Sequence, residues 1–274
     1  MSSKIMVFSH PNHEVAVLGT IFRLRPHIIY LTDGGDEARV DQTKQALQSY
    51  DLASVHYLNH SEQSLYNALR EGDSEFYCEL AAQVGGVIQK LNGEEVFCDA
   101  VEFYNPVHDI ALPVVRAALA SNDVPIFEVP LIYQKTGSVE TFELQRVPGS
   151  LSSQEICVEL SREELNQKTA TIEGGIYTML FEQLGSAILD ALPSSGGHEH
   201  FLKGRSSLPT PAPEQLLRYE MRGRLLKDAG VVREVITFDK HYAPIFEALC
   251  GASDPLDSQS SSVLGSSAAP APRP

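Results

Sequence analysis

The chain opens with the apolar run Ile5-Met6-Val7-Phe8, and the stretch His10-Pro11-Asn12-His13-Glu14 follows it almost at once. A short apolar run bounded by turn residues is typical of a buried strand. Open α/β sheets carry their ligand-binding residues just beyond the carboxyl ends of such strands. The sequence therefore places two imidazoles, those of His10 and His13, where a sheet of this kind carries its chemistry.

A second cluster stands in the same relation to a strand. The run Glu95-Val96-Phe97-Cys98 is strand-like, and Tyr104-Asn105-Pro106-Val107-His108-Asp109 comes after it. If both strands share one sheet, His108 reaches the same edge as the first two histidines. Three imidazoles that converge on one point form a good catalytic zinc site, and imidazole also suits iron. The alternative for each histidine is structural: it caps a helix or bonds a backbone carbonyl.

The first 130 residues alternate short β-branched runs with longer helical patterns. This alternation indicates βαβ units. We expect strands at residues 5–9, 27–32, 54–58, 95–99 and 125–129, and helices at 36–50, 74–91 and 108–120. The predicted fold class is α/β: a Rossmann-like, mostly parallel sheet with helices on both faces.

The pattern changes after Pro130. Residues 139–147 and 155–160 predict two antiparallel strands, a small element in the C-terminal half. Ser161 followed by Glu164 predicts a capping box that opens a helix. This helix is expected to run to about Leu192, with an interruption at Gly174-Gly175.

Residues 194–213 are rich in Ser, Gly and Pro and predict a surface loop, either mobile or reaching over a site, that holds His198 and His200. A helix from Arg218, a strand at 231–238 and a final amphipathic helix follow. The Ser, Ala and Pro composition near the end predicts a disordered tail. We expect one α/β domain over residues 1–252 and a tail over 253–274.

Composition narrows the class of protein. The 274 residues hold 36 Asp and Glu against 21 Lys and Arg, a formal net charge of −15, which repels nucleic acid. Because no segment approaches about 18 consecutive apolar residues and no charged leader precedes an apolar stretch, we expect a cytoplasmic protein without a membrane span. The four cysteines are far apart and predict buried thiols rather than disulfides. A homo-oligomer is compatible with the sequence but not specified by it.

Together these motifs resemble the PIG-L (LmbE-like) zinc-dependent de-N-acetylases, which remove an acyl group from an amino sugar. The resemblance covers nearly the whole chain except the tail. The matching segments are His10-Pro11-Asn12-His13-Glu14 for the family's His-Pro-Asp-Asp-Glu, Leu31-Thr32-Asp33-Gly34, Arg39 with Asp41, Asn105-Pro106-Val107-His108 for His-Pro-Asp-His, and the C-terminal segments 218–223, 235–237 and 241–244.

The resemblance implies a metal held by His10, His13 and His108, with zinc expected and iron as the alternative. His13 stands where the family has an acidic ligand, so a neutral ligand replaces a charged one. A neutral ligand leaves more positive charge on the metal, which favours ionisation of a bound water.

Two departures concern the catalytic residues that the resemblance implies. Asn12 replaces the Asp that serves as general base, and an amide cannot take up a proton in the working range. Asn105 replaces a histidine that stabilises the oxyanion, although its amide can still donate a hydrogen bond. The carboxylates near the motifs that could replace the base are Glu14, Asp33, Glu102 and Asp109.

Two of these carboxylates have structural alternatives. Glu14 would lie in the first turn of a helix, where it interacts favourably with the helix dipole. Asp109 follows a proposed ligand and could instead orient a histidine.

The leading hypothesis is a metal-dependent hydrolase in which a metal-activated water attacks an amide of an N-acyl amino sugar or a related small metabolite. One alternative keeps the fold and the three histidines but performs different chemistry in specialised metabolism, with zinc or ferrous iron. The other is a non-catalytic protein that binds a sugar or metabolite. Asn12 and Asn105 are the residues that keep these alternatives open.

Overall fold

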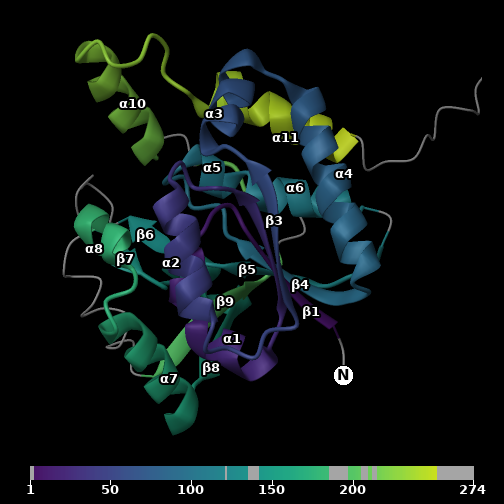
Figure 1. Ribbon diagram of the computed structural model, residues 1–274. Helices are drawn as coiled ribbons and strands as arrows, with labels where there is room; N and C mark the ends of the chain where they lie inside the picture. Colours follow the sequence, from purple (N-terminus) through teal and green to yellow (C-terminus); the bar gives the residue numbers. More distant parts are fainter. Residues whose placement is uncertain are drawn as a thin grey trace, which may run out of the picture.

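The computed structural model describes residues 3–120, 122–134, 142–184, 197–204, 209–211 and 215–251. Its centre is a seven-stranded sheet with helices on both faces (Figure 1). In spatial order its strands are β3 (Ser54–His60), β2 (His27–Thr32), β1 (Ser3–Phe8), β4 (Gly93–Asp99), β5 (Ile126–Val129), β9 (His198–Lys203) and β8 (Glu155–Glu159). Strands β1 to β5 pair in parallel, and β9 is antiparallel to both its neighbours. The predicted α/β class is confirmed.

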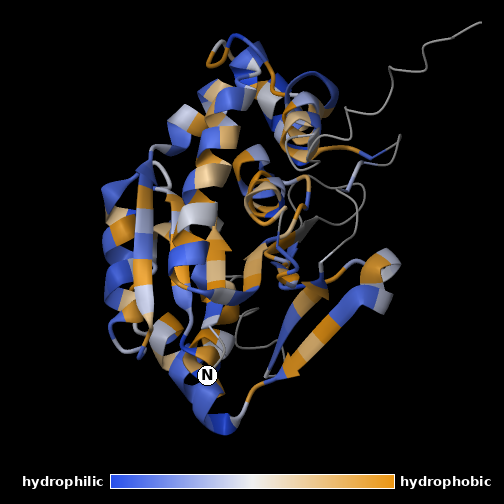
Figure 2. Ribbon diagram, turned by 90° about the vertical axis from the view of Figure 1, so that its right-hand side faces the viewer, coloured by the Kyte–Doolittle hydropathy of each residue, from blue (hydrophilic) through white to orange (hydrophobic). Residues whose placement is uncertain are grey.

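Strand β1 is buried on both faces, as its unbroken apolar run predicts. Ile5 and Val7 belong to one core cluster, whereas Met6 and Phe8 belong to the other. The first cluster includes residues of α3 (Glu62–Glu71), α4 (Ser74–Lys90), α6 (Ala111–Ala118) and α11 (Ala243–Gly251), and the second includes residues of α1 (Leu18–Leu24), α2 (Glu37–Leu47), α7 (Arg162–Glu173) and α8 (Thr178–Leu184). Orange and blue alternate along the helices in Figure 2, as amphipathic helices packed on a sheet require.

The order of the strands reverses between β1 and β4. From β1 the chain proceeds outward through β2 and β3, and it then returns to β4 and β5 on the other side of β1. Ligands of open α/β sheets bind at such a switch point, outside the carboxyl ends of the strands. The motif after β1 and the motif after β4 therefore meet at one crevice.

Helix α3 is absent from the sequence predictions, although its signals are present. The Ser61 side chain accepts a hydrogen bond from Ser64 N at 3.1 Å and caps the helix. Leu65, Ala68 and Leu69 are buried at helical spacing. Gly72 then ends the helix in the left-handed region, with a φ of 67°.

The capping box at Ser161 is confirmed. The Ser161 hydroxyl accepts from Glu164 N at 3.3 Å, and Ser161 N donates to Glu164 Oε2 at 2.7 Å. The predicted interruption is also present: α7 ends at Glu173, Gly175 has a φ of 68°, and α8 begins at Thr178. The predicted continuation to Leu192 lies partly outside the described residues, and the predicted tail over residues 253–274 lies wholly outside them.

The predicted small antiparallel element in the C-terminal half is confirmed, although its two strands do not pair with each other. Strand β7 (Phe142–Leu144) pairs with β6 (Ile132–Gln134) in a separate two-stranded sheet, while β8 pairs with β9. Strand β9 lies within residues 194–213, so the surface loop predicted there is wrong for residues 198–203. Its formation depends on distant residues: the buried Glu199 accepts from Gly19 N at 2.9 Å, from Thr20 N at 2.8 Å and from Lys168 Nζ at 2.7 Å.

The strand predicted at 231–238 is also wrong. This segment has no strand and leads into a π-helix, η3 (Phe238–Tyr242). It packs against α10 (Arg218–Asp228) instead of joining a sheet. A side chain at Gly223 would lie only 2.8 Å from Val235 Cγ1, so the glycine permits this close approach.

All four cysteines are free thiols. The prediction that they are buried holds for Cys98, whereas Cys78 is half-buried and Cys157 and Cys250 are exposed. Cys157 lies on β8, which is the edge strand of the sheet. Within the described residues, the helices are all too short or too polar to span a membrane.

Candidate metal centre

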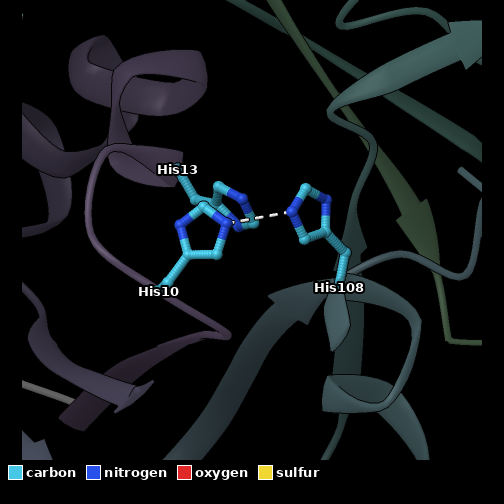
Figure 3. A group of neighbouring side chains, drawn as sticks. All are labelled: His10, His13 and His108. Atoms are coloured by element: carbon cyan, nitrogen blue, oxygen red, sulfur yellow. Dashed lines mark hydrogen bonds between the residues drawn. The ribbon is translucent and has the colours of Figure 1, made fainter. Parts of the chain in front are cut away.

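Three buried histidines meet at the switch point of the sheet. The ligand atoms offered by His10, His13 and His108 all lie within 4.8 Å of one another. His10 and His13 come from the loop after β1, and His108 comes from the short helix α5 (Pro106–Asp109), so the rings face one another across the crevice (Figure 3). His10 Nε2 and His108 Nε2 are 2.9 Å apart. The structure thus brings together the three residues that the sequence singles out as metal ligands.

Hydrogen bonds fix the tautomers of two of the rings. His13 Nδ1 lies 2.8 Å from Asp99 Oδ2, and His10 Nδ1 lies 2.8 Å from the backbone oxygen of Pro11. A carboxylate and a carbonyl oxygen only accept, so each Nδ1 is the donor. Nε2 of both rings is then left with a lone pair for a metal, the arrangement that outer partners commonly impose on histidine ligands.

The electrostatics of the cluster favour neutral imidazoles. Burial lowers the pKa of His10 and of His108 well below the usual value, and nearby His13 and Arg39 lower both further. His108 Nδ1 has no hydrogen-bond partner within the ranges that the structure describes. Nitrogen atoms bound tetrahedrally to one zinc at about 2.0–2.1 Å are about 3.3–3.4 Å apart, so the 2.9 Å between His10 and His108 requires only a small adjustment. The donor set fits a divalent metal.

Asp99 is a residue of this site that the motifs do not reveal. It ends β4, and its Oδ2 also accepts from Ser9 N and Ser9 Oγ, each at 2.7 Å. Asp99 thereby joins the ends of β1 and β4 and holds the ring of His13. Its only sequence signal is an acidic residue at the carboxyl end of a buried strand.

The end of β2 supports the same site. Gly34 has a φ of 72°, and a side chain there would lie 3.3 Å from His10 Cβ and 3.0 Å from Arg39 Cδ. Arg39 Nη1 lies 3.4 Å from His10 Nδ1. Asp41, its acidic companion in the motif, is exposed and pairs with Lys44 at 3.4 Å.

Asn12 lines the same cavity as the three histidines. Its φ is 80°, a left-handed conformation that asparagine tolerates better than most residues. Its Oδ1 lies 3.1 Å from Thr43 Oγ1, whose single hydroxyl hydrogen it shares with Glu14, whereas its buried Nδ2 has no partner among the described residues. Among the described residues, an amide donor without a partner therefore stands at the position where the sequence resemblance implies a general base.

Asn105 caps helix α5 and so positions His108. Its Oδ1 accepts from Val107 N and from Tyr66 Oη, each at 2.9 Å. Asn105 also lines the cavity. Both replacement asparagines are therefore on the cavity wall, with their side-chain oxygens occupied by donors from the protein.

Glu14 does not line the cavity. Its carboxylate accepts from Thr43 Oγ1 at 2.7 Å, from Tyr30 Oη at 2.9 Å and from Tyr177 Oη at 3.1 Å. Burial raises its pKa. Three hydroxyls thus surround the carboxylate of Glu14, which is a residue of the 3-10 helix η1 (His13–Val17).

The other three carboxylates predicted near the motifs bond to backbone N–H groups. Asp109 Oδ1 accepts from Glu102 N at 2.8 Å and from Phe103 N at 3.2 Å, and so shapes the loop before His108. Glu102 in turn accepts from Leu131 N and Ile132 N. Asp33 accepts from Gly35 N and Glu62 N. The cavity wall includes none of the three.

The cavity has a volume of about 640 Å³ and extends from the histidines to helices α3 and α10. Among the described residues its acidic side chains are Glu62 and Glu234. Glu234 forms an ion pair with Lys240 and lies 3.4 Å from His241 Nε2. Burial raises the pKa of Glu62, which has no ion-pair partner in the part of the chain that the structure describes. The motifs miss Glu62 because it begins α3, a helix absent from the predictions.

Comparison with proteins of known structure identifies the fold of this chain. No family model and no curated protein matches the chain. Among solved structures, the A40926 pseudoaglycone deacetylase Dbv21 aligns with a TM-score of 0.52 and 11% identity, over 74% of this chain and 96% of that one. The chain has an LmbE-like fold.

The conserved protein TT1542 from Thermus thermophilus is also similar, with a TM-score of 0.50 and 18% identity. That alignment covers 79% of this chain and all of TT1542. At such identities the likeness shows the LmbE-like fold alone. The roles of individual residues therefore depend on the geometry described above.

Proposed function

We propose that this chain is a metal-dependent hydrolase of the PIG-L type, which cleaves an amide of an N-acyl amino sugar or a related small metabolite. The observation that carries the proposal is the cluster of His10, His13 and His108, buried at the switch point and open to a cavity of about 640 Å³. Zinc is the expected metal and iron the alternative. When bound, such a metal polarises the substrate carbonyl and activates a water.

The chain itself supplies the remaining groups. Asn12 Nδ2, which has no partner in the described part of the chain, can donate a hydrogen bond to the substrate. Asn105 accepts from Val107 and Tyr66 through Oδ1, which leaves its Nδ2 hydrogens for the oxygen of the reacting carbonyl. We assign these two asparagines to binding and orientation of the amide.

Proton transfer requires a group that asparagine cannot provide. We assign it to Glu62, because its carboxylate lines the cavity and burial brings its pKa closer to neutral pH. Glu14 and Asp109 then act as positioning residues: Glu14 holds η1, and Asp109 holds the loop that carries His108. Asp99 positions His13 in the same way.

Metal content tests the proposal directly. We expect about one zinc or iron per chain in elemental analysis of untagged protein, and a sharp loss of metal in His10→Ala, in His13→Ala and in His108→Ala. His200→Ala is the matched control, because His200 lies on β9 and pairs with Glu155 outside the cavity. Unchanged metal content in the three cluster variants would remove the site.

Activity then separates the alternatives. Release of acetate or another acyl group from a panel of N-acyl amino sugars supports the hydrolase. Bound metal without amide cleavage favours the alternative of different chemistry at a three-histidine metal. No metal after reconstitution with zinc or iron favours the non-catalytic binding protein, to which the asparagines at positions 12 and 105 also point.

A further inference from the structure

The cavity gathers positive charge in an acidic protein. Four arginines line it, against two glutamates, although the whole chain has a formal net charge of −15. One of the glutamates, Glu234, is already neutralised by Lys240. The four arginines are Arg39, Arg70, Arg218 and Arg222.

Two of the arginines stand one turn apart on a single helix. Arg218 and Arg222 are separated by four residues on α10, so both side chains lie on one face of that helix. The Arg218 guanidinium lies 4.0 Å from the centre of the Tyr104 ring. Across the cavity, Arg70 on α3 lies 5.9 Å from the centre of the Tyr66 ring. A guanidinium held against an aromatic ring keeps its N–H edge available for paired oxygens.

Two of the cavity arginines, Arg70 and Arg222, differ from arginines elsewhere in the fold. Arg23 pairs with Glu164 at 2.6 Å, and Arg224 pairs with Glu220 at 3.0 Å. Within the described residues, neither Arg70 nor Arg222 has a carboxylate partner; Arg70 donates only to the amide oxygen of Asn67. Uncompensated guanidinium groups in a cavity attract an anion.

We infer that the substrate carries an anionic oxygen group, a phosphate or a carboxylate, which Arg70, Arg218 and Arg222 bind while the amide lies at the histidines. This inference rests on the proposed hydrolase function for the reacting end of the substrate. For the anionic end of the substrate, the inference depends only on the arginines. Guanidinium groups bind phosphate and carboxylate with the same paired geometry, so the shared chemistry is an oxyanion.

Binding without metal tests the inference apart from hydrolysis. The full chain is treated with chelator and titrated at low salt with N-acetylglucosamine, N-acetylglucosamine 6-phosphate and N-acetylmuramic acid, with binding followed by NMR and calorimetry. We expect at least one charged probe to bind about 10-fold or more tightly than the neutral sugar and to weaken as salt is added. The phosphate and the carboxylate probe show which oxyanion is preferred.

Variants locate the binding site. Arg222→Ala and the double variant Arg218→Ala/Arg222→Ala are expected to reduce the preference for the charged probe. Arg224→Ala is the matched control: this residue is exposed on the same helix and lies outside the cavity. Arg222 is itself exposed, so its replacement leaves the packing of α10 intact.

Three results would overturn the inference: no binding of either charged probe, equal affinity for charged and neutral probes, or a preference that survives the double variant. None of them bears on metal content or amide cleavage. Conversely, loss of the proposed hydrolase function leaves this metal-free binding result unchanged. The two proposals therefore fail separately.

Discussion

His13 Nδ1 donates to Asp99 Oδ2 at 2.8 Å, which links the motif after β1 to the end of β4. The same carboxylate oxygen accepts two hydrogen bonds from Ser9. Because both residues are buried, this contact sets the tautomer and the orientation of His13 before any metal binds. The geometry of the candidate metal centre therefore depends on residues from two neighbouring strands, β1 and β4, and not on one loop alone.

Replacement of the positioning carboxylate is expected to weaken the metal site. Asp99→Asn keeps the size of the side chain but removes its charge, so we expect zinc affinity to fall about 10- to 100-fold, as for other outer partners of metal ligands. Competition with a chromogenic chelator measures the affinity. Asp41→Asn, at an exposed position on α2, is the control. Unchanged affinity in Asp99→Asn would exclude this role.

Asn12→Asp is expected to increase amide hydrolysis about 10-fold or more, because it adds, besides Glu62, a second proton acceptor next to the histidines. The neighbouring Thr43 Oγ1 has one hydroxyl hydrogen, and Glu14 accepts it at 2.7 Å. The same change places a second buried carboxylate on the hydroxyl that bonds Glu14, so Tm should fall in metal-free protein. Turnover that does not respond, in a variant that still folds, argues for changed chemistry.

Glu62→Gln is expected to lower turnover by about 100-fold with metal content unchanged, since it removes the proposed proton acceptor. Glu234→Gln is the paired control, because that carboxylate lines the same cavity but is engaged by Lys240. The raised pKa of Glu62 also predicts the direction in which activity changes with pH. Its active form is the carboxylate, so activity should rise with pH through a pKa above the usual value of 4.5. Equal turnover in the two variants would rule out Glu62.

Replacing one partner of the buried ion pair between Lys168 and Glu199 is expected to lower the free energy of unfolding strongly. Their side chains are 1% and 0% exposed. Lys168→Met leaves a buried carboxylate without its cation, so we expect a loss of about 3–5 kcal/mol in the free energy of unfolding by urea. Lys44→Met, at an exposed position, should change it by less than about 0.5 kcal/mol. Similar values for both would show that the pair adds nothing.

The contact between Arg23 and Glu164 predicts a dependence of stability on pH. Hydrogen bonds from Arg23 lower the pKa of Glu164 from 4.5 to about 2. A lowered pKa stabilises the folded protein above about pH 4.5, and this contribution is lost as pH falls towards 2. In Glu164→Gln, unfolding between these pH values should depend less on pH than in the parent chain. If the variant and the parent chain show the same pH dependence of unfolding, the contact between Arg23 and Glu164 is not its cause.

The sequence alone determined the parallel part of the fold and the three histidines. These features have local causes: short apolar or β-branched runs mark β1 to β5, and the motifs follow two of those strands. Ligand-binding residues of open α/β sheets lie at the carboxyl ends of the strands, and this rule predicts that His10, His13 and His108 lie close together. Helix α3 also has local signals, in Ser61 and the apolar spacing that follows it.

Tertiary structure decided which acidic residues take part. Asp109 has the right place in the sequence to orient a histidine, yet it bonds backbone N–H groups, and Asp99 from the neighbouring strand orients His13 instead. Glu62 reaches the cavity only because α3 packs beside the crevice. Residues 198–203 form a strand because β5 and β8 flank them and Glu199 finds Lys168. Periodicity is local, whereas hydrogen-bond partners and burial are set by residues far away in the chain, and these decided the second half of the fold and the wall of the cavity.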